Sequence, residues 1–229
     1  MNPHIVVIIP AYNEALSVHY VVRDIPPGLV DEIIVVDNNS SDGTAAIAAA
    51  AGATVIVEKE QGYGAACLRG IAYLAAKPVP PDIVVFMDAD YSDYVEQLGR
   101  LIGPITELGY EMVIGSRALG KQEKGAMTVQ QVVGNKLATV LLKWIYKVHY
   151  TDLGPYRAIR FGALQQLRMK DRNYGWTVEM QLKAAREKLR ITEVPVDYRR
   201  RIGVSKVSGT IKGTILAGYK IITTIFKYS

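Results

Sequence analysis

The stretch Ile5–Glu14, IVVIIPAYNE, opens with five consecutive apolar residues, continues with a proline, and ends in the polar pair Asn13 and Glu14. Glu32–Thr44, EIIVVDNNSSDGT, and Ile83–Asp90, IVVFMDAD, repeat this change from β-branched and apolar residues to polar ones. Short apolar runs bounded by Pro, Asn, Asp or Gly are typical of strands that are buried on both faces. We therefore expect three buried strands, each of which ends in a polar cluster.

Strands and helices alternate throughout the first half of the chain. The expected strands are Ile5–Ile9, Glu32–Val36, Thr54–Val57, Ile83–Met87 and Met112–Ile114. The expected helices are Glu14–Asp24, Thr44–Ala51, Ala65–Ala76 and Tyr94–Ile102. This alternation predicts an α/β fold in which helices flank both faces of a mostly parallel central sheet. Ligands of such sheets bind at the carboxyl ends of the strands, so the polar clusters should open on one crevice.

The second half of the chain is less regular. Its expected elements are a helix over Val129–Tyr146, a loop over Asp152–Arg157, a helix over Val178–Glu187, a strand over Ile191–Tyr198, a basic loop over Arg199–Lys206 and an apolar helix over Ile211–Phe226. No linker rich in Pro, Gly or Ser separates the two halves. Residues 1–209 are therefore expected to form one domain, followed by an amphipathic helix at 210–229.

The net charge of +5 conceals an asymmetry between the two halves. Residues 1–120 contain 6 Lys and Arg against 15 Asp and Glu, whereas residues 121–229 contain 21 against 7. An acidic half suits a divalent cation, and a basic half suits phosphate groups or an anionic membrane surface. Nucleic acid is not an expected partner, because the basic residues lie among aliphatic helices without a nucleic-acid-binding motif.

Cysteine content and the N-terminus bear on the cellular compartment. Cys67 is the only cysteine, so no internal disulfide is possible, which fits a reducing compartment. No basic region precedes the first apolar run, and no apolar stretch reaches the roughly 18 residues that span a bilayer. These features lead us to expect a cytoplasmic protein.

Asp88 and Asp90 follow directly on an expected strand, with one residue between them. Two carboxylates so placed can both reach a hard cation such as Mg²⁺ or Mn²⁺, which would bridge to phosphate oxygens of a substrate. The alternative is a solvated acidic turn. The position at the end of the fourth strand of a parallel sheet favours the metal site.

Two other strand ends offer groups for a nucleotide. Asp37 stands before Ser41–Gly43, which can cap the following helix, so its carboxylate is available to a base or ribose. Pro10–Glu14 leads from the first strand into a helix whose N-terminus can face phosphate. Neither a G-x-G-x-x-G motif nor a Walker lysine is present, so dinucleotide and P-loop sites are not supported.

The order of these motifs resembles that of a known family. IIPAYNEA, VVDNNSSDGT, QGYGAACLRG, FMDAD and IGSR occur here in the order found in family 2 glycosyltransferases of the GT-A fold. TDLGPYRAIR and RRIGVSKVSG are similar to segments of the dolichol-phosphate mannose synthase-like branch. The resemblance implies a single nucleotide-binding domain. Its nucleotide- and metal-binding half would be residues 1–120, and its acceptor half residues 121–209.

The resemblance also assigns a role to each matching position. The residues expected around the nucleotide are Pro10, Tyr12, Glu14, Asp37 and Asp88. Those expected at the metal are Asp88 and Asp90, and those expected to act in catalysis are Asp90 and Arg117. Those expected on the acceptor side or at a phosphate are Asp152, Arg157, Arg200, Ser205 and Lys206.

The implied reaction is an inverting transfer of a hexose from a GDP-mannose or UDP-glucose type donor to polyprenyl or dolichyl phosphate. A bound cation and arginines would stabilise the charge that develops on the leaving nucleoside diphosphate. A phosphate acceptor is already an anion and needs no general base, whereas a hydroxyl acceptor needs a carboxylate to take its proton. Glu179 is the candidate for that base, although a helix N-terminus equally favours an acidic residue there.

Three other functions stay open. The nearest is transfer to a hydroxyl of a lipid or glycan. A sugar nucleotidyltransferase shares the sheet, but Pro10–Ala15 lacks the Gly-rich basic loop that such enzymes use after the first strand. A non-catalytic nucleotide- or lipid-binding module would not need both the carboxylate pair and a basic phosphate loop.

The C-terminal segment, residues 210–229, mixes apolar residues with Lys212, Lys220 and Lys227. A helix of this kind can lie in a membrane interface, or it can pack on the sheet or in a homodimer. The lipid acceptor implied by the resemblance favours the membrane. We therefore expect peripheral association with the cytoplasmic face of a membrane.

Overall fold

The structure is a computed structural model, and it describes residues 3–204 and 211–227. Side chains are described for the same residues except 211–217. Within these ranges, no helix combines the length and the apolar character that crossing a membrane requires.

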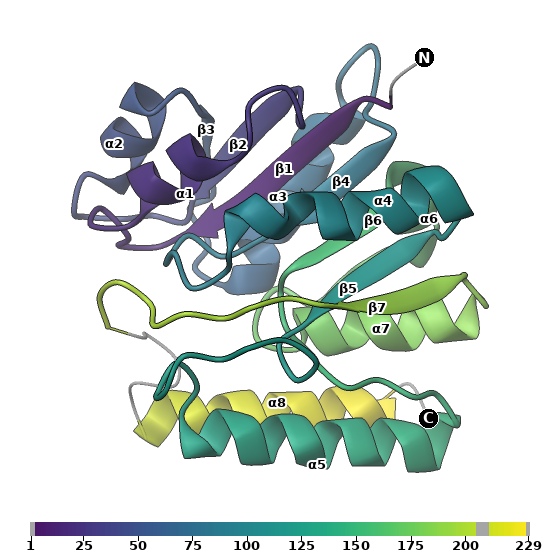
Figure 1. The fold of residues 1–229 in the computed structure, drawn as a ribbon. Coiled ribbons are helices and arrows are strands. Elements are labelled where there is room, and N and C mark those ends of the chain that lie inside the picture. Colours follow the sequence, from purple (N-terminus) through teal and green to yellow (C-terminus); the bar gives the residue numbers. More distant parts are fainter. Residues whose placement is uncertain (1–2, 205–210, 228–229) are drawn as a thin grey trace.

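Seven strands of the described chain form one sheet, in the order β3-β2-β1-β4-β6-β5-β7 (Figure 1). The strands are β1 (Ile5–Ala11), β2 (Glu32–Asp37), β3 (Thr54–Val57), β4 (Ile83–Phe86), β5 (Met112–Ser116), β6 (Arg157–Arg160) and β7 (Ile191–Pro195). All neighbouring pairs are parallel except those of β6, which runs antiparallel to both β4 and β5. The expected mostly parallel sheet is confirmed.

Helices cover both faces of this sheet. They are α1 (Val18–Asp24), α2 (Thr44–Ala50), α3 (Tyr63–Ala75), α4 (Leu98–Leu108), α5 (Val129–Tyr146), α6 (Phe161–Leu167), α7 (Trp176–Arg186) and α8 (Ile211–Lys227), with a short 3₁₀ helix η1 (Val95–Gln97) before α4. One apolar core joins the sheet to α1, α2 and α4, and a second joins it to α3, α6 and α7 and includes the inner sides of α5 and α8. The helices α5 and α8 lie side by side outside the second layer (Figure 1).

One part of the second expected half is where the prediction from sequence is wrong. The loop expected over Asp152–Arg157 leads into the strand β6, and α6 follows it directly. The four residues of β6, RAIR, contain two arginines and so lack the apolar run by which the other strands were found. They form a strand because β4 and β5 hydrogen-bond to them from both sides.

The antiparallel direction of β6 has a consequence for the site. Phe86, at the end of β4, pairs with Arg157, at the start of β6. The loop before β6 therefore lies at the same edge of the sheet as the carboxyl ends of the parallel strands. Residues from the second half of the chain are brought in this way to the end of the fourth strand.

The first helix also differs from its expected bounds. It begins at Val18, because the carbonyl of Glu14 accepts hydrogen bonds from the amides of Ser17 and Val18, at 3.1 and 2.9 Å, in a preceding turn. The remaining elements of the first half lie where the alternating pattern predicts them, within about two residues at their ends, except that α4 continues to Leu108, beyond the expected end at Ile102.

A close backbone contact joins α3 to the loop before α7. The amide of Ala65 donates to the carbonyl of Arg172 at 2.8 Å. A Cβ atom added at Gly64 would lie only 2.1 Å from the carbonyl oxygen of Asp171. The small residues of this stretch therefore let the two backbones touch, which fixes the loop beside the carboxyl ends of the strands.

Replacement of Gly64 by Ala is expected to lower the free energy of unfolding by about 1–3 kcal/mol, because the added methyl group overlaps this carbonyl. Gly103→Ala on α4 is the matched control, since Glu107 Oε1, at 3.8 Å, is the sole described atom within 4 Å of the added carbon. This change should raise the free energy of unfolding by about 0.5–1 kcal/mol. Urea denaturation measures both values. A Gly64→Ala variant as stable as the control would contradict the close contact.

Candidate active site

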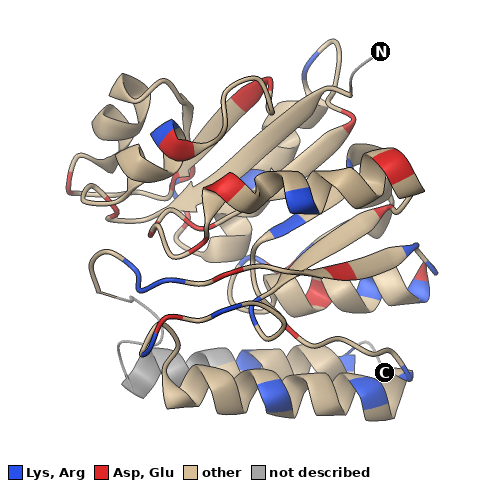
Figure 2. Ribbon diagram, in the orientation of Figure 1, with Lys and Arg blue, Asp and Glu red and all other residues tan. Residues whose placement is uncertain are grey.

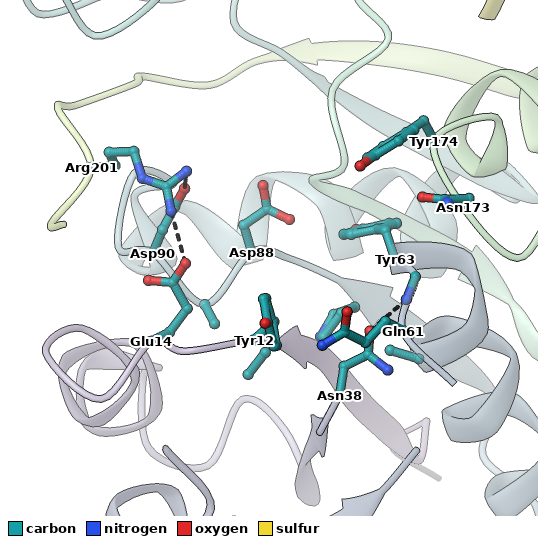
Figure 3. A pocket seen from close by; sticks show the side chains of 15 residues that line it. Tyr12, Glu14, Asn38, Gln61, Tyr63, Asp88, Asp90, Asn173, Tyr174 and Arg201 are labelled. Atoms are coloured by element: carbon teal, nitrogen blue, oxygen red, sulfur yellow. Dashed lines mark hydrogen bonds and ion pairs between the residues drawn. The ribbon is translucent and has the colours of Figure 1, made fainter. Parts of the chain in front are cut away.

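A cavity of about 440 Å³ opens at the carboxyl ends of β1, β2 and β4 (Figure 3). The expected residues that line it are Pro10, Tyr12, Glu14, Asp88 and Asp90. Asn38, Gln61, Tyr63, Asn173, Tyr174 and Arg201 also line it. We call this the first cavity. The structure thus brings together the polar clusters of three strands, as the sequence predicts.

The carboxylate pair lies in the turn that follows β4. Asp90 is almost fully buried, and its Oδ1 accepts hydrogen bonds from the amide and hydroxyl of Ser92, at 2.9 and 2.5 Å. Tyr91, between Asp90 and Ser92, has a φ of +62°, which is the left-handed conformation of a tight turn. Asp88 is half-buried and faces the cavity (Figure 3). The turn therefore holds both carboxylates at the strand end.

A third carboxylate, Asp93, completes this cluster and was not predicted. The amide of Asp88 donates to Asp93 Oδ2 at 3.4 Å, while Asp93 Oδ1 is buried without a hydrogen-bond partner among the described residues. Burial, and then the charge of Asp90, raise the pKa of Asp93 to about 7. Burial, and then the charges of Asp90 and Asp93, raise the pKa of Asp88 well above its usual value. The only signal in the sequence is a further acid three residues after the pair.

This crowding of negative charge fits a divalent cation. No three His, Cys, Asp or Glu side chains of the described residues form a complete metal site by themselves. Mg²⁺ is commonly held by one or two carboxylates, and phosphate oxygens and water complete its coordination. Asp88 and Asp90 offer such a partial site, in which a bound cation would reverse the electrostatic cost of placing the carboxylates together.

Arg201 supplies the positive charge that faces the cluster. Its guanidinium contacts Asp90 Oδ2 at 3.0 Å and Glu14 Oε1 at 2.8 Å, and thereby links the loop after β7 to the ends of β1 and β4 (Figure 3). The carbonyl of Asp90 also accepts from the amide of Ile202 at 2.9 Å. Like Asp93, this arginine was not among the site residues predicted from the sequence.

Its neighbour Arg200, which was expected at a phosphate, lines neither cavity described here. The amide of Arg200 donates to Glu123 Oε2 at 2.9 Å, and its Nε donates to the carbonyl of Lys124 at 2.8 Å. The residue of this loop that faces the carboxylates is Arg201, which the prediction did not include. Ser205 and Lys206, the other two expected residues of this loop, lie outside the described residues.

Asp37 and Asn38 end β2 beside the first cavity. Asp37 is buried, and its Oδ1 has no hydrogen-bond partner among the described residues. Asn38 lines the cavity and donates to the carbonyls of Glu58 and Glu60, at 3.1 and 2.7 Å. Its Oδ1 accepts from the amide of Gly62 at 2.7 Å. Asn38 thus joins the ends of β2 and β3 to the start of α3.

A second cavity, of about 340 Å³, adjoins the first. Tyr63, Asp88, Asp90, Tyr174 and Arg201 line both cavities. The rest of its wall includes Arg117, Gln130, Gln131, Gly134, Trp176, Thr177, Tyr198, Gly218 and Ile221. It is therefore bounded by α5, α7 and α8 and meets the first cavity at the carboxylate pair.

Arg117 is held in the wall of the second cavity by Asp152. Arg117 Nε and Nη2 donate to the two oxygens of this carboxylate, each at 2.7 Å, and the backbone amide adds a contact of 2.8 Å. Burial alone would raise the pKa of Asp152, but the charge and hydrogen bonds of Arg117 lower it below its usual value. The guanidinium also lies over the ring of Tyr198, 5.0 Å from its centroid. The pair fixes one positive group at this cavity.

Arg157 lines neither cavity, contrary to its expected place on the acceptor side. It is fully buried on β6, and its guanidinium donates to the carbonyls of Leu153, Gly154 and Thr177. These contacts tie the loop before β6 to the start of α7. Arg157 therefore supports the wall of the second cavity from behind.

Glu179, the expected general base, is also absent from both cavities. Its carboxylate accepts from the amides of Lys170 and Asp171, the latter at 2.7 Å, and contacts Lys183 Nζ at 2.8 Å. Only 1% of the residue is exposed. This position contradicts the role of a base that reaches the acceptor. The carboxylate is engaged in hydrogen bonds that hold the loop leading to Asn173 and Tyr174.

Comparison with known proteins bears on the activity of this site. The profile of Glycosyl transferase family 2 matches residues 6–168. An uncharacterized glycosyltransferase of Mycobacterium tuberculosis is 34% identical over 218 residues, which cover 93% of this chain and 94% of that protein. The undecaprenyl-phosphate mannosyltransferase of Micrococcus luteus is 32% identical over 163 residues, 67% of this chain and 64% of that protein.

A solved structure extends the similarity to nearly the whole chain. It is glucosyl-3-phosphoglycerate synthase from Mycobacterium tuberculosis in complex with Mn²⁺, UDP-glucose and phosphoglyceric acid. The two structures agree with a TM-score of 0.78 at 25% identity, over 99% of this chain and 80% of the other. The fold is accordingly GT-A, and the chain belongs to glycosyl transferase family 2.

Proposed function

We propose that this glycosyltransferase moves a hexose from a GDP-mannose or UDP-glucose type donor to polyprenyl or dolichyl phosphate, with inversion at the transferred carbon. The observation that carries the proposal is the meeting of two cavities at Asp88 and Asp90. Similarity to the Micrococcus luteus enzyme, whose name specifies undecaprenyl phosphate, supports this acceptor and the dolichol-phosphate mannose synthase-like branch.

The nucleotide-sugar donor would occupy the first cavity. Pro10 and Tyr12 would face the nucleoside, with Asp37 behind them, and the diphosphate would lie toward Asp88 and Asp90. Mg²⁺ or Mn²⁺ at these carboxylates would neutralise the diphosphate as it leaves. The solved complex with Mn²⁺ and UDP-glucose supports a divalent cation in this fold. Arg201, beside the pair, is placed to contact the same phosphates after release from Asp90.

The acceptor would occupy the second cavity, with its phosphate toward Arg117 and Arg201. Among the described residues, the only carboxylates that line this cavity are Asp88 and Asp90, which the donor and cation would engage. A hydroxyl acceptor would therefore find no separate general base, whereas a phosphate is already an anion and attacks without one. This chemistry favours a phosphate acceptor over a hydroxyl.

A small phosphorylated hydroxy acid is the second candidate acceptor. The observation in its favour is the solved structure of similar fold that contains phosphoglyceric acid. Transfer to its hydroxyl would require one carboxylate of the cluster to take the proton. The two acceptors differ in their need for a lipid, which makes them separable by experiment.

The protein would act at the cytoplasmic face of a membrane, as a peripheral protein that 210–229 helps to attach. The described part of α8 also packs on the protein, since Ile225 is buried and Lys220 Nζ contacts Asp171 Oδ2 at 3.1 Å. The helix can therefore present only its outer face to a partner. A homodimer through this face is the alternative to the membrane.

Release of nucleoside diphosphate from a panel of GDP- and UDP-sugars tests the reaction. We expect one donor to be turned over only when polyprenyl phosphate is added in detergent. The product should carry the opposite anomeric configuration, because the acceptor displaces the diphosphate in one step. Turnover that depends on phosphoglyceric acid, without turnover on polyprenyl phosphate, would contradict the lipid acceptor and support the phosphorylated hydroxy acid.

Asp90→Asn is expected to lower kcat by about 10²–10³-fold, because it removes a charge that holds the cation at the leaving group. Glu107→Gln, an exposed change on α4, is the matched control and should leave kcat unaltered. Both variants should unfold cooperatively on heating. Undiminished turnover by metal-free protein in EDTA would contradict the role of the cation.

Arg201→Gln and Arg200→Gln form a pair that separates two neighbouring arginines. We expect Arg201→Gln to lower kcat/KM for the donor by about tenfold to 10²-fold, because of these two arginines Arg201 is the one that contacts the carboxylates, beside which the diphosphate would lie. Arg200→Gln should retain kcat/KM within about twofold, since its guanidinium faces Lys124. The reverse order of effects would show that the loop binds the donor in another arrangement.

A further inference from the structure

The outer face of α5 is apolar along its whole length. Val129, Val133, Leu137, Val140 and Trp144 are all exposed, and Val129 and Trp144 are 75% and 83% exposed. Their spacing of three or four residues places them on one side of the helix. The opposite side is the one that packs on the protein, through Ala138 and Leu142. Exposed apolar side chains that adjoin one another along a helix of a folded domain are typical of a contact surface.

The neighbouring helix α8 adds exposed apolar side chains to this stripe. Tyr219, Ile222 and Phe226 are exposed on α8, at a spacing of three and four residues. The two helices pack against each other and run side by side (Figure 1). We call the outward side chains of both helices the α5–α8 face.

The charge of this face is of one sign. Lys136, Lys143 and Lys147 accompany the stripe of α5, and Lys227 ends α8, whereas Lys220 of α8 is paired with Asp171. The sequence contains no Asp or Glu from 125 to 151 or from 209 to 229. Figure 2 shows the same pattern, in which α5 and the described part of α8 carry basic residues and no acidic ones. A second copy of the face would set like charges against each other, whereas an anionic surface would complement them.

We propose that the α5–α8 face docks on an anionic lipid bilayer and that α5, rather than 210–229 alone, provides most of the contact. The apolar stripe would enter the boundary between headgroups and acyl chains, and the lysines that accompany the stripe of α5 would lie at the anionic headgroups. This inference rests on the proposed peripheral attachment, and it does not depend on which sugar is transferred.

The same two helices form part of the second cavity. Gln130 and Gly134 of α5 line the cavity, while Val129 and Val133 of the same two turns belong to the stripe. Ile221 of α8 lines the cavity beside the exposed Ile222. A lipid phosphate could therefore place its head in the cavity while its chain stays in the bilayer that the stripe contacts.

Trp144 offers a direct probe, because the other tryptophan, Trp176, is 1% exposed. We expect the fluorescence emission of the full chain to shift to the blue on addition of phosphatidylglycerol vesicles, and much less with phosphatidylcholine vesicles. Lipids brominated on the acyl chain should quench this emission, and Trp144→Phe should abolish both signals. No shift and no quenching would overturn the proposal.

Paired variants then test whether the stripe carries the binding. Val133→Glu with Leu137→Glu should lower the vesicle partition coefficient at least about tenfold, because two apolar contacts are replaced by charges of the wrong sign. Leu108→Glu, at a 61% exposed residue of α4, is the control and should bind as the unaltered chain does. All of these side chains are exposed, so the melting temperatures should agree closely.

The remaining outcomes separate this inference from the proposed reaction. Wild-type vesicle binding by the double variant would overturn the inference, even if the enzyme transfers hexose to polyprenyl phosphate in detergent. A dimer in sedimentation that the double variant dissociates would also overturn it, in favour of a second copy. Binding that requires the stripe, by a protein inactive toward polyprenyl phosphate, would support the inference while the proposed reaction fails.

Discussion

Mutual repulsion among the carboxylates after β4 is the constraint around which the site is arranged. Asp88, Asp90 and Asp93 lie within six residues of one another and are shielded from water to different degrees. Charges so placed are costly unless positive charge or hydrogen bonds compensate them. In the structure Arg201 provides the compensation from a loop more than a hundred residues later in the sequence. A cation and diphosphate would provide it when substrate is bound.

The surrounding chain is organised to hold the walls of the two cavities in place. Three buried charged residues do so without lining the first cavity: Asp152 orients Arg117, Arg157 ties the loop before β6 to α7, and Glu179 fixes the loop before α7. Each has its charge paired or hydrogen-bonded, as a buried ionic group must be. Rigid walls of this kind position polar groups before the substrate arrives, so that little reorganisation accompanies the reaction.

The sequence predicted the first half of the fold well, because its strands are long apolar runs whose ends carry the polar clusters. The second half was harder for reasons visible in particular residues. β6 has an arginine at each end and becomes a strand only through its neighbours. Arg199, Arg200 and Arg201 are chemically identical, so the turn of the backbone alone decides which one faces the carboxylates. The sequence also does not show whether the carboxylate of an acidic residue at a helix start accepts hydrogen bonds from backbone amides. The carboxylate of Glu179 does accept such bonds, and it is therefore not available as a base.

The insertion of β6 between β4 and β5 also limits how proteins of this architecture can diversify. A strand from the second half is hydrogen-bonded on both sides to strands from the first, so the two halves cannot be exchanged between relatives as separate modules. Exchange would break two ladders in the middle of the sheet. The parts that can vary with little cost to the sheet are those that lie outside it, namely α5, α8 and the loop after β7. Changes of acceptor during evolution should therefore be concentrated in these peripheral segments, while the strands that carry the carboxylates persist.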